Sequence, residues 1–133
     1  MLMNMEEFDI GFAKIIIHGE SFAEVIVKEG VEFDEAMVDT YHAFLRTHLT
    51  APFRLLINKV NSYSYSFKAQ QTIGSIPEID CMAILGYTPM TMFSIRALIQ
   101  VPREHQWNVE VFTDRMEALA WLGEDRSLVS AAQ

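Results

Sequence analysis

The stretch that decides the fold lies in the middle of the chain and reads Phe53-Arg54-Leu55-Leu56-Ile57-Asn58-Lys59-Val60. Its apolar residues at 55–57 are consecutive, and such a run is typical of a β-strand that is covered on both faces. Strands covered in this way occur in parallel sheets that carry helices on their two sides. The run therefore predicts a central strand of an α/β domain.

Strands and helices alternate around this run. Before it, residues 12–18 and 22–28 are predicted strands joined by a hairpin, and a helix is predicted from Asp34 to about Leu49. After it, the pattern predicts helices at 67–73, 88–101 and 115–122, and strands at 81–87 and 107–112. The order β-β-α-β-α-β-α-β-α predicts one α/β domain over residues 1–133, in which helices pack on a mixed, largely parallel sheet.

The predicted helix starts carry specific local signals. Asp34 and Thr88 are good N-cap residues, because their side-chain oxygens can accept hydrogen bonds from the free amides of the first turn. Pro89 suits the first helical position, and Asp114 has the spacing of a capping box with Glu117. Within the strand at 22–28, the alternation predicts that Glu24 belongs to the polar face.

Length and composition exclude several classes of protein. The chain has 133 residues, of which half are apolar, and 10 basic and 18 acidic residues give a formal charge of −8. That length suits one domain, and the apolar fraction excludes intrinsic disorder. The acidic balance argues against general nucleic-acid binding, which needs a basic face to release phosphate counterions.

Compartment follows from the cysteine content and from the apolar runs. Cys81 is the only cysteine, so no internal disulfide can form, which fits a reducing cytoplasm. The first residues lack the basic and apolar regions of a signal peptide. The apolar runs are far shorter than the roughly 20 residues that a membrane span requires. We expect a cytoplasmic protein without a membrane span.

Catalytic and metal-binding motifs are not found in the sequence. The glycines are scattered and form no phosphate-binding loop, and there is no nucleophile elbow. His42 and His48 are six residues apart, which places them about 120° apart around a helix, so they would not chelate one metal ion. No catalytic residue, metal ligand or cofactor is therefore predicted.

A run of alternating serine and tyrosine follows the central strand, and it contains Asn61, Ser62, Ser64 and Ser66. In open α/β sheets the edge at which strands end and helices begin commonly holds the binding surface. Two interpretations stay open: the polar side chains contact a ligand or are phosphorylated, or the serines cap the helix while the tyrosines pack in the core.

Charge is unevenly distributed along the chain. Residues 1–45 have ten acids and two bases, residues 78–133 have four bases and eight acids, and residues 46–77 have four bases and no acid. The basic segment includes the Ser/Tyr run, so Lys59 and Lys68 are predicted contacts for a small anion or an acidic partner at the start of the second helix. The alternative interpretation is that these charges are only solvated.

Met90, Met92 and Phe93 open the third predicted helix. They either pack in the core or form an adaptable apolar contact surface, since methionine side chains repack readily. Exposure distinguishes the two interpretations, because a contact surface would show at least one of the three side chains. Met90 and Phe93 are also a candidate patch for a homodimer.

The end of the chain suggests a family. A strand, Val109-Glu110-Val111-Phe112-Thr113-Asp114, is followed by a helix that includes Glu117-Ala118-Leu119-Ala120-Trp121-Leu122. Together with the element order, this ending resembles the SpoIIAA-like group of small bacterial proteins and the STAS domains of anti-sigma factor antagonists. The resemblance implies that a partner kinase phosphorylates a residue at the start of the second helix. Ser66 is the nearest equivalent and Ser64 the next, although the aspartate and glycine of the family motif are missing.

The resemblance implies a non-catalytic regulatory or protein-interaction module. Its expected contacts lie at Asn61 to Ser66 and at the start of the third helix. The alternative function is a carrier of a lipid or another small apolar ligand, since some members of the group share a carrier-like architecture. An enzyme would need convergent polar groups in a pocket, and the spacing of the residues nominates no such set.

Overall fold

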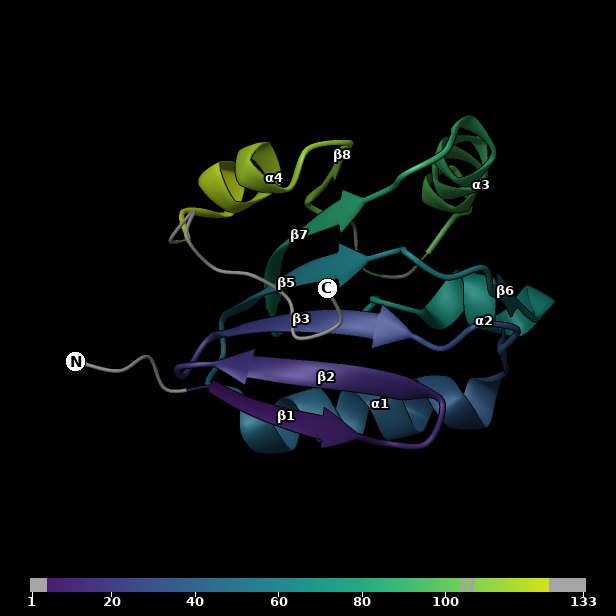
Figure 1. Ribbon diagram of the computed structural model, residues 1–133. Coiled ribbons are helices and arrows are strands. Elements are labelled where there is room, and N and C mark those ends of the chain that lie inside the picture. The colour runs from purple at the N-terminus through teal and green to yellow at the C-terminus, as the bar shows by residue number, and fades with distance from the viewer. Residues whose placement is uncertain (1–4, 104, 106, 125–133) are drawn as a thin grey trace.

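A six-stranded sheet forms the frame of the structure, a computed structural model that describes residues 5–103, 105 and 107–124. The strands lie in the order β1 (Met5–Asp9), β2 (Ala13–His18), β3 (Phe22–Val27), β5 (Phe53–Asn58), β7 (Ile79–Leu85) and β8 (Val109–Phe112). The first three pair antiparallel, and β3, β5, β7 and β8 pair parallel (Figure 1). The predicted single α/β fold with a mixed, largely parallel sheet is confirmed.

In the described part of the chain, four helices cover the two faces of this sheet: α1 (Glu35–His48), α2 (Phe67–Thr72), α3 (Pro89–Ile99) and α4 (Arg115–Leu122). Leu55 of β5 belongs to the core that includes residues of α1, α2 and α3, whereas Leu56 belongs to the core beneath α4. The central strand is therefore covered on both faces, as its continuous apolar run predicts. Among the described residues, no helix is long and apolar enough to cross a membrane.

Two of the three predicted helix caps are confirmed in detail. The Asp34 carboxylate accepts a hydrogen bond of 2.9 Å from the Met37 amide, and the Thr88 hydroxyl accepts one of 3.1 Å from the Thr91 amide. Asp114 occupies the N-cap position of α4, but its side chain makes no cap hydrogen bond. The prediction of a capping box at this helix is therefore wrong, because the Asp114 carboxylate does not accept the expected hydrogen bond from the first turn.

Three short strands were not predicted from the sequence. β1 is mostly exposed, and its sequence lacks an apolar alternation that would mark it. β4 (Glu32–Phe33) and β6 (Ser64–Tyr65) pair parallel in a separate two-stranded sheet. This pairing fixes the Ser/Tyr run, because the Ser64 amide donates to the Val31 carbonyl oxygen at 3.0 Å and the Ser66 amide donates to that of Phe33 at 2.8 Å.

Glu24 occupies a different environment from the one predicted. It was expected on a polar face of β3, and the structure buries it completely on the side of the sheet that α4 covers. Arg115, at the start of α4, pairs with its carboxylate at 2.6 Å. The expectation is wrong because alternation within one strand does not reveal whether the second face of the sheet is covered.

Candidate binding site

The candidate site lies at the carboxyl ends of β3, β5 and β7, where β6, α2 and α3 come together (Figure 1). The chain leaves β5 at Asn58, but the Lys59 amide still donates to the Leu85 carbonyl oxygen of β7 at 2.9 Å. The Asn61 side chain donates to the Val27 carbonyl oxygen at 2.9 Å and so ties the following turn to β3. These two hydrogen bonds hold Lys59 and the Ser/Tyr run at the edge where open α/β sheets commonly bind ligands.

Lys59 is nearly buried, with 8% of its surface exposed. It has the same strand parity as Leu55 and Ile57, which belong to the larger core. Its Nζ atom lies 3.9 Å from the centroid of the Tyr63 ring and 5.4 Å from that of Tyr65, in cation–π contact. Burial lowers the pKa of the Lys59 ammonium to about 8. Within the described residues, this ammonium makes no hydrogen bond and no ion pair.

Beneath Lys59 is a small enclosed space, which we call the inner cavity. Its volume is about 30 Å³, enough for about two water molecules. The wall brings together side chains from both ends of the chain and is lined by Val25, Val27, Phe33, Tyr41, Ile57, Lys59, Tyr63, Tyr65, Ile73, Gly74, Met82, Ile84, Ile95, Leu98 and Trp107. No acidic side chain belongs to this set.

Two polar groups of the inner cavity are buried, the Tyr63 hydroxyl and the Trp107 indole N–H. The indole N–H makes no hydrogen bond with a described residue, whereas the Tyr63 hydroxyl interacts with the Tyr65 side chain. Burial raises the pKa of Tyr63 well above its ordinary value and that of Tyr65 to about 12, so both rings carry neutral hydroxyls near neutral pH. Arg103 stacks on the Trp107 ring at 3.6 Å and fixes that wall of the cavity.

A wider depression opens outward from the same wall, and we call it the outer groove. It has a volume of about 300 Å³ and lies between the Ser/Tyr run, α2 and α3. Its lining consists of Lys59, Tyr63, Ser64, Tyr65, Gln70, Phe93, Ser94, Ala97 and Leu98. The inner cavity and the outer groove share Lys59, both tyrosines and Leu98, so Lys59 lies where the two spaces meet.

Three of the residues predicted from the sequence meet in the outer groove, namely Lys59, Ser64 and Phe93. The predicted Asn61, Ser62 and Ser66 instead stabilise the turn: the Ser62 amide donates to Glu29 at 3.0 Å, and the Ser66 hydroxyl caps α2 by accepting from the Ala69 amide at 3.2 Å. Lys68 is exposed on α2 and does not line the groove.

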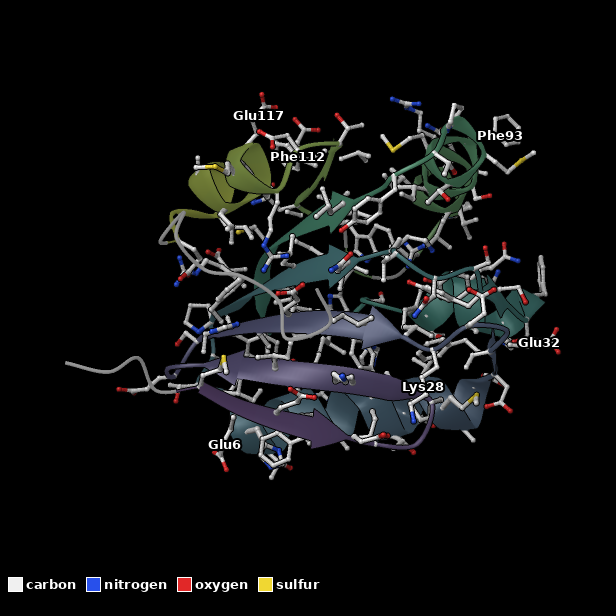
Figure 2. All side chains as sticks on the ribbon, in the orientation of Figure 1. Glu6, Lys28, Glu32, Phe93, Phe112 and Glu117 are labelled. Atoms are coloured by element: carbon white, nitrogen blue, oxygen red, sulfur yellow. The ribbon has the colours of Figure 1, made fainter. Side chains whose placement is uncertain are left out.

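Met90 and Phe93 are strongly exposed, at 75% and 73%. Both lie on α3 one turn apart, and Figure 2 shows the Phe93 side chain projecting from this helix into open space. Met92, the third residue of the group, is partly buried against the larger core. This exposure favours the interpretation of Met90 and Phe93 as a contact surface.

The aromatic part of the site was missed by sequence reasoning. Tyr63, Tyr65 and Trp107 were not singled out, since tyrosine and tryptophan patterns do not distinguish a cavity wall from ordinary packing. One signal was available: Lys59 continues the inward parity of Leu55 and Ile57, and a lysine at such a position is buried beneath its neighbours.

A second polar cluster lies on the opposite face of the sheet. The Glu24 carboxylate accepts hydrogen bonds from Arg115 and, at 3.0 Å, from Asn58, and the Tyr87 hydroxyl donates to Asn58 at 2.7 Å. Both Glu24 oxygens are engaged, so this cluster holds α4 against the sheet. Across the described ranges, no three His, Cys, Asp or Glu side chains come together to form a candidate metal site.

No family model matches the chain, and no curated protein matches it. One solved structure is similar in its backbone fold. It is described as an uncharacterized protein from the DUF3478 family with a SpoIIAA-like fold, from Shewanella loihica PV-4. Its sequence is 12% identical to this one. The structural alignment covers 90% of this chain and 93% of the other, with a TM-score of 0.48. Its description agrees with the expected SpoIIAA-like resemblance, and the binding site rests on the residues of this chain alone.

Proposed function

We propose that the protein is a non-catalytic regulatory module that binds a partner protein at the rim of the outer groove. The observation that carries this proposal is the exposure of Met90 and Phe93 side by side on α3, next to a groove that also contains Ser64. Clustered exposed apolar side chains beside polar ones are typical of protein contact sites. Phe67, at the start of α2, is also strongly exposed, at 75%.

Modification of Ser64 would regulate such a contact. Ser64 is exposed in the groove, whereas the Ser66 hydroxyl is engaged as the cap of α2. A phosphoryl group on Ser64 would add a negative charge of about 1.5–2 at neutral pH to the groove that Lys59 also lines. Among the two serines that the family resemblance suggests, Ser64 is therefore the better candidate for a phospho-switch.

Photo-crosslinking in native cells tests the partner site. With a photoreactive amino acid in place of Phe93, we expect one discrete adduct with a different protein, and the substitution Ser64→Glu should reduce its yield several-fold. The matched control places the same group at Met116, which is 53% exposed on α4. Equal adducts from positions 93 and 116, or none from 93, would contradict the proposal. An adduct between two copies of this chain would identify the rim as a homodimer contact instead.

The alternative function as a lipid carrier is not favoured by the geometry. Pockets that enclose a ligand usually have volumes of roughly 300–1,000 Å³. The inner cavity, at about 30 Å³, cannot enclose an acyl chain, and the outer groove at about 300 Å³ has room only for a small molecule.

A further inference from the structure

We propose that the outer groove binds a small organic carboxylate, whose carboxylate group contacts the Lys59 ammonium while its apolar body lies along Phe93, Ala97 and Leu98. This site goes beyond the proposed partner contact: it lies inside the groove, although Phe93 and Ser64 belong to both. Three separate features of the described residues lead to it: an uncompensated buried cation, an unpartnered donor, and a groove of matching size.

The first feature is the uncompensated charge of Lys59. A buried ammonium is costly unless a counter-charge or hydrogen bonds compensate it. Lys59 is nine-tenths buried and has only the faces of Tyr63 and Tyr65 as electrostatic partners among the described residues. Contact with an aromatic face recovers only part of the lost hydration. An anion in the groove would supply the missing counter-charge.

The second feature is the character of the surrounding polar atoms. The Trp107 N–H is a buried donor without a described partner in the inner cavity, and the Tyr63 side chain, whose hydroxyl interacts with Tyr65, lines both the cavity and the groove. Among the described residues, no acidic side chain lines the cavity or the groove, although the whole chain carries a formal charge of −8. A site with one cation, a free donor and no carboxylate of its own is complementary to an anionic ligand.

The third feature is the size and the apolar wall of the groove. Its volume of about 300 Å³ is at the lower end of the range for small-molecule pockets. Phe93, Ala97 and Leu98 of α3 form an apolar side, and Gln70 and Ser94 add polar groups. A bare phosphate would leave this apolar side without a partner, because all its oxygens need hydrogen bonds or water. A carboxylate attached to a compact apolar body therefore fits better than a bare phosphate.

Fluorescence titration with benzoate tests this site. The substitution Trp121→Phe removes the tryptophan of α4, so that the signal comes from Trp107 in the cavity wall. We expect a saturable change with benzoate, binding at least ten-fold weaker with uncharged benzamide, and no saturation with inorganic phosphate. Lys59→Met should weaken benzoate binding at least ten-fold. Lys68→Met, which replaces an exposed lysine on α2, should leave the binding unchanged.

Affinity should also fall with rising pH, because only the charged Lys59 attracts the carboxylate. With the pKa of Lys59 at about 8, the charged fraction falls roughly 30-fold between pH 7 and 9.5. The other titratable groups facing Lys59 are Tyr41 of α1, Tyr63 just before β6 and Tyr65 of β6. Burial raises the pKa of each above its ordinary value, so they stay neutral over this range.

Several results would overturn the proposal: equal binding of benzamide and benzoate, tighter binding of phosphate, affinity that is indifferent to Lys59→Met, or no saturation up to the solubility limit of benzoate. Circular dichroism checks that Lys59→Met is folded. If it is not, Tyr63→Phe provides the second variant, since it removes one hydroxyl donor and should weaken benzoate binding several-fold without changing the charge. Unchanged affinity in Tyr63→Phe together with affinity independent of pH would then reject the site.

Discussion

Replacing Glu24 by alanine should lower the free energy of unfolding by about 3–5 kcal/mol, the usual cost of removing one partner of a buried ion pair. Glu24 is completely buried, and its two carboxylate oxygens accept hydrogen bonds of 2.6 and 2.9 Å from the Arg115 guanidinium. Asn58 donates a third bond to it at 3.0 Å. The alanine variant deprives these donors of their acceptor within a buried site. Urea denaturation followed by circular dichroism measures the loss.

Two variants serve as controls for this prediction. Glu24→Gln keeps the size of the side chain and one oxygen acceptor, so its loss should be clearly smaller than that of Glu24→Ala. Asp9→Ala removes the acid of an exposed pair with Lys28, and exposed pairs contribute little to stability. A loss for Glu24→Ala no larger than that for Asp9→Ala would show that the buried pair does not hold α4 on the sheet.

The second large effect concerns Lys59, whose burial should make the wild type less stable than the Lys59→Met variant at pH 7. The pKa of Lys59 is lowered from 10.5 to about 8 by burial. A difference of that size corresponds to about 3 kcal/mol of unfavourable free energy in the folded state. Below pH 8 the ammonium is charged in both the folded and the unfolded state, so the whole penalty applies. Methionine has a similar shape and carries no charge, so it avoids the penalty.

The advantage of Lys59→Met should shrink as the pH rises. Between pH 8 and 10.5 the folded protein releases the Lys59 proton while the unfolded chain keeps it, so wild-type stability rises with pH. Between pH 8 and 9.5 the gap between the two proteins should narrow by about 1.6 kcal/mol. The raised pKa values of the buried Tyr65 and Cys81 lower stability at alkaline pH in both proteins alike, so the difference isolates Lys59.

Urea denaturation of both proteins at half-unit steps of pH measures this gap, and Lys68→Met is the matched exposed control. A gap that does not change with pH would contradict the burial of an uncompensated ammonium. A wild type more stable than Lys59→Met at pH 7 would contradict it too.

Much of the fold was predictable because its signals are local. The consecutive apolar residues around Leu56 marked a strand with two covered faces, and Asp34 and Thr88 marked helix starts through their capping oxygens. β4 and β6 have no such signal, since each is two residues long and exists only because they pair with each other. Their pairing depends on tertiary structure, which no local pattern encodes.

The site was predictable only where its residues are consecutive or exposed. Ser64 lies in a polar run after a buried strand, and Phe93 lies at a helix start rich in methionine. The inner cavity joins Tyr41, Lys59 and Trp107, which are far apart in the sequence, and only the assembled fold brings them together. The same holds for Glu24 and its pair with Arg115, which joins β3 to α4 across 91 positions of the chain.

The role assigned to Lys59 rests on the burial of its side chain among aromatic rings without a described counter-charge. The most direct measurement is the titration of the Lys59 side chain by ¹³C NMR, with Lys59→Met used to assign the Cε resonance. We predict a midpoint at about pH 8 in the free protein, moving upward when benzoate is added, because a bound carboxylate stabilises the charged form. A midpoint near the ordinary value of 10.5 that does not respond to benzoate would contradict both the burial of the charge and the carboxylate site.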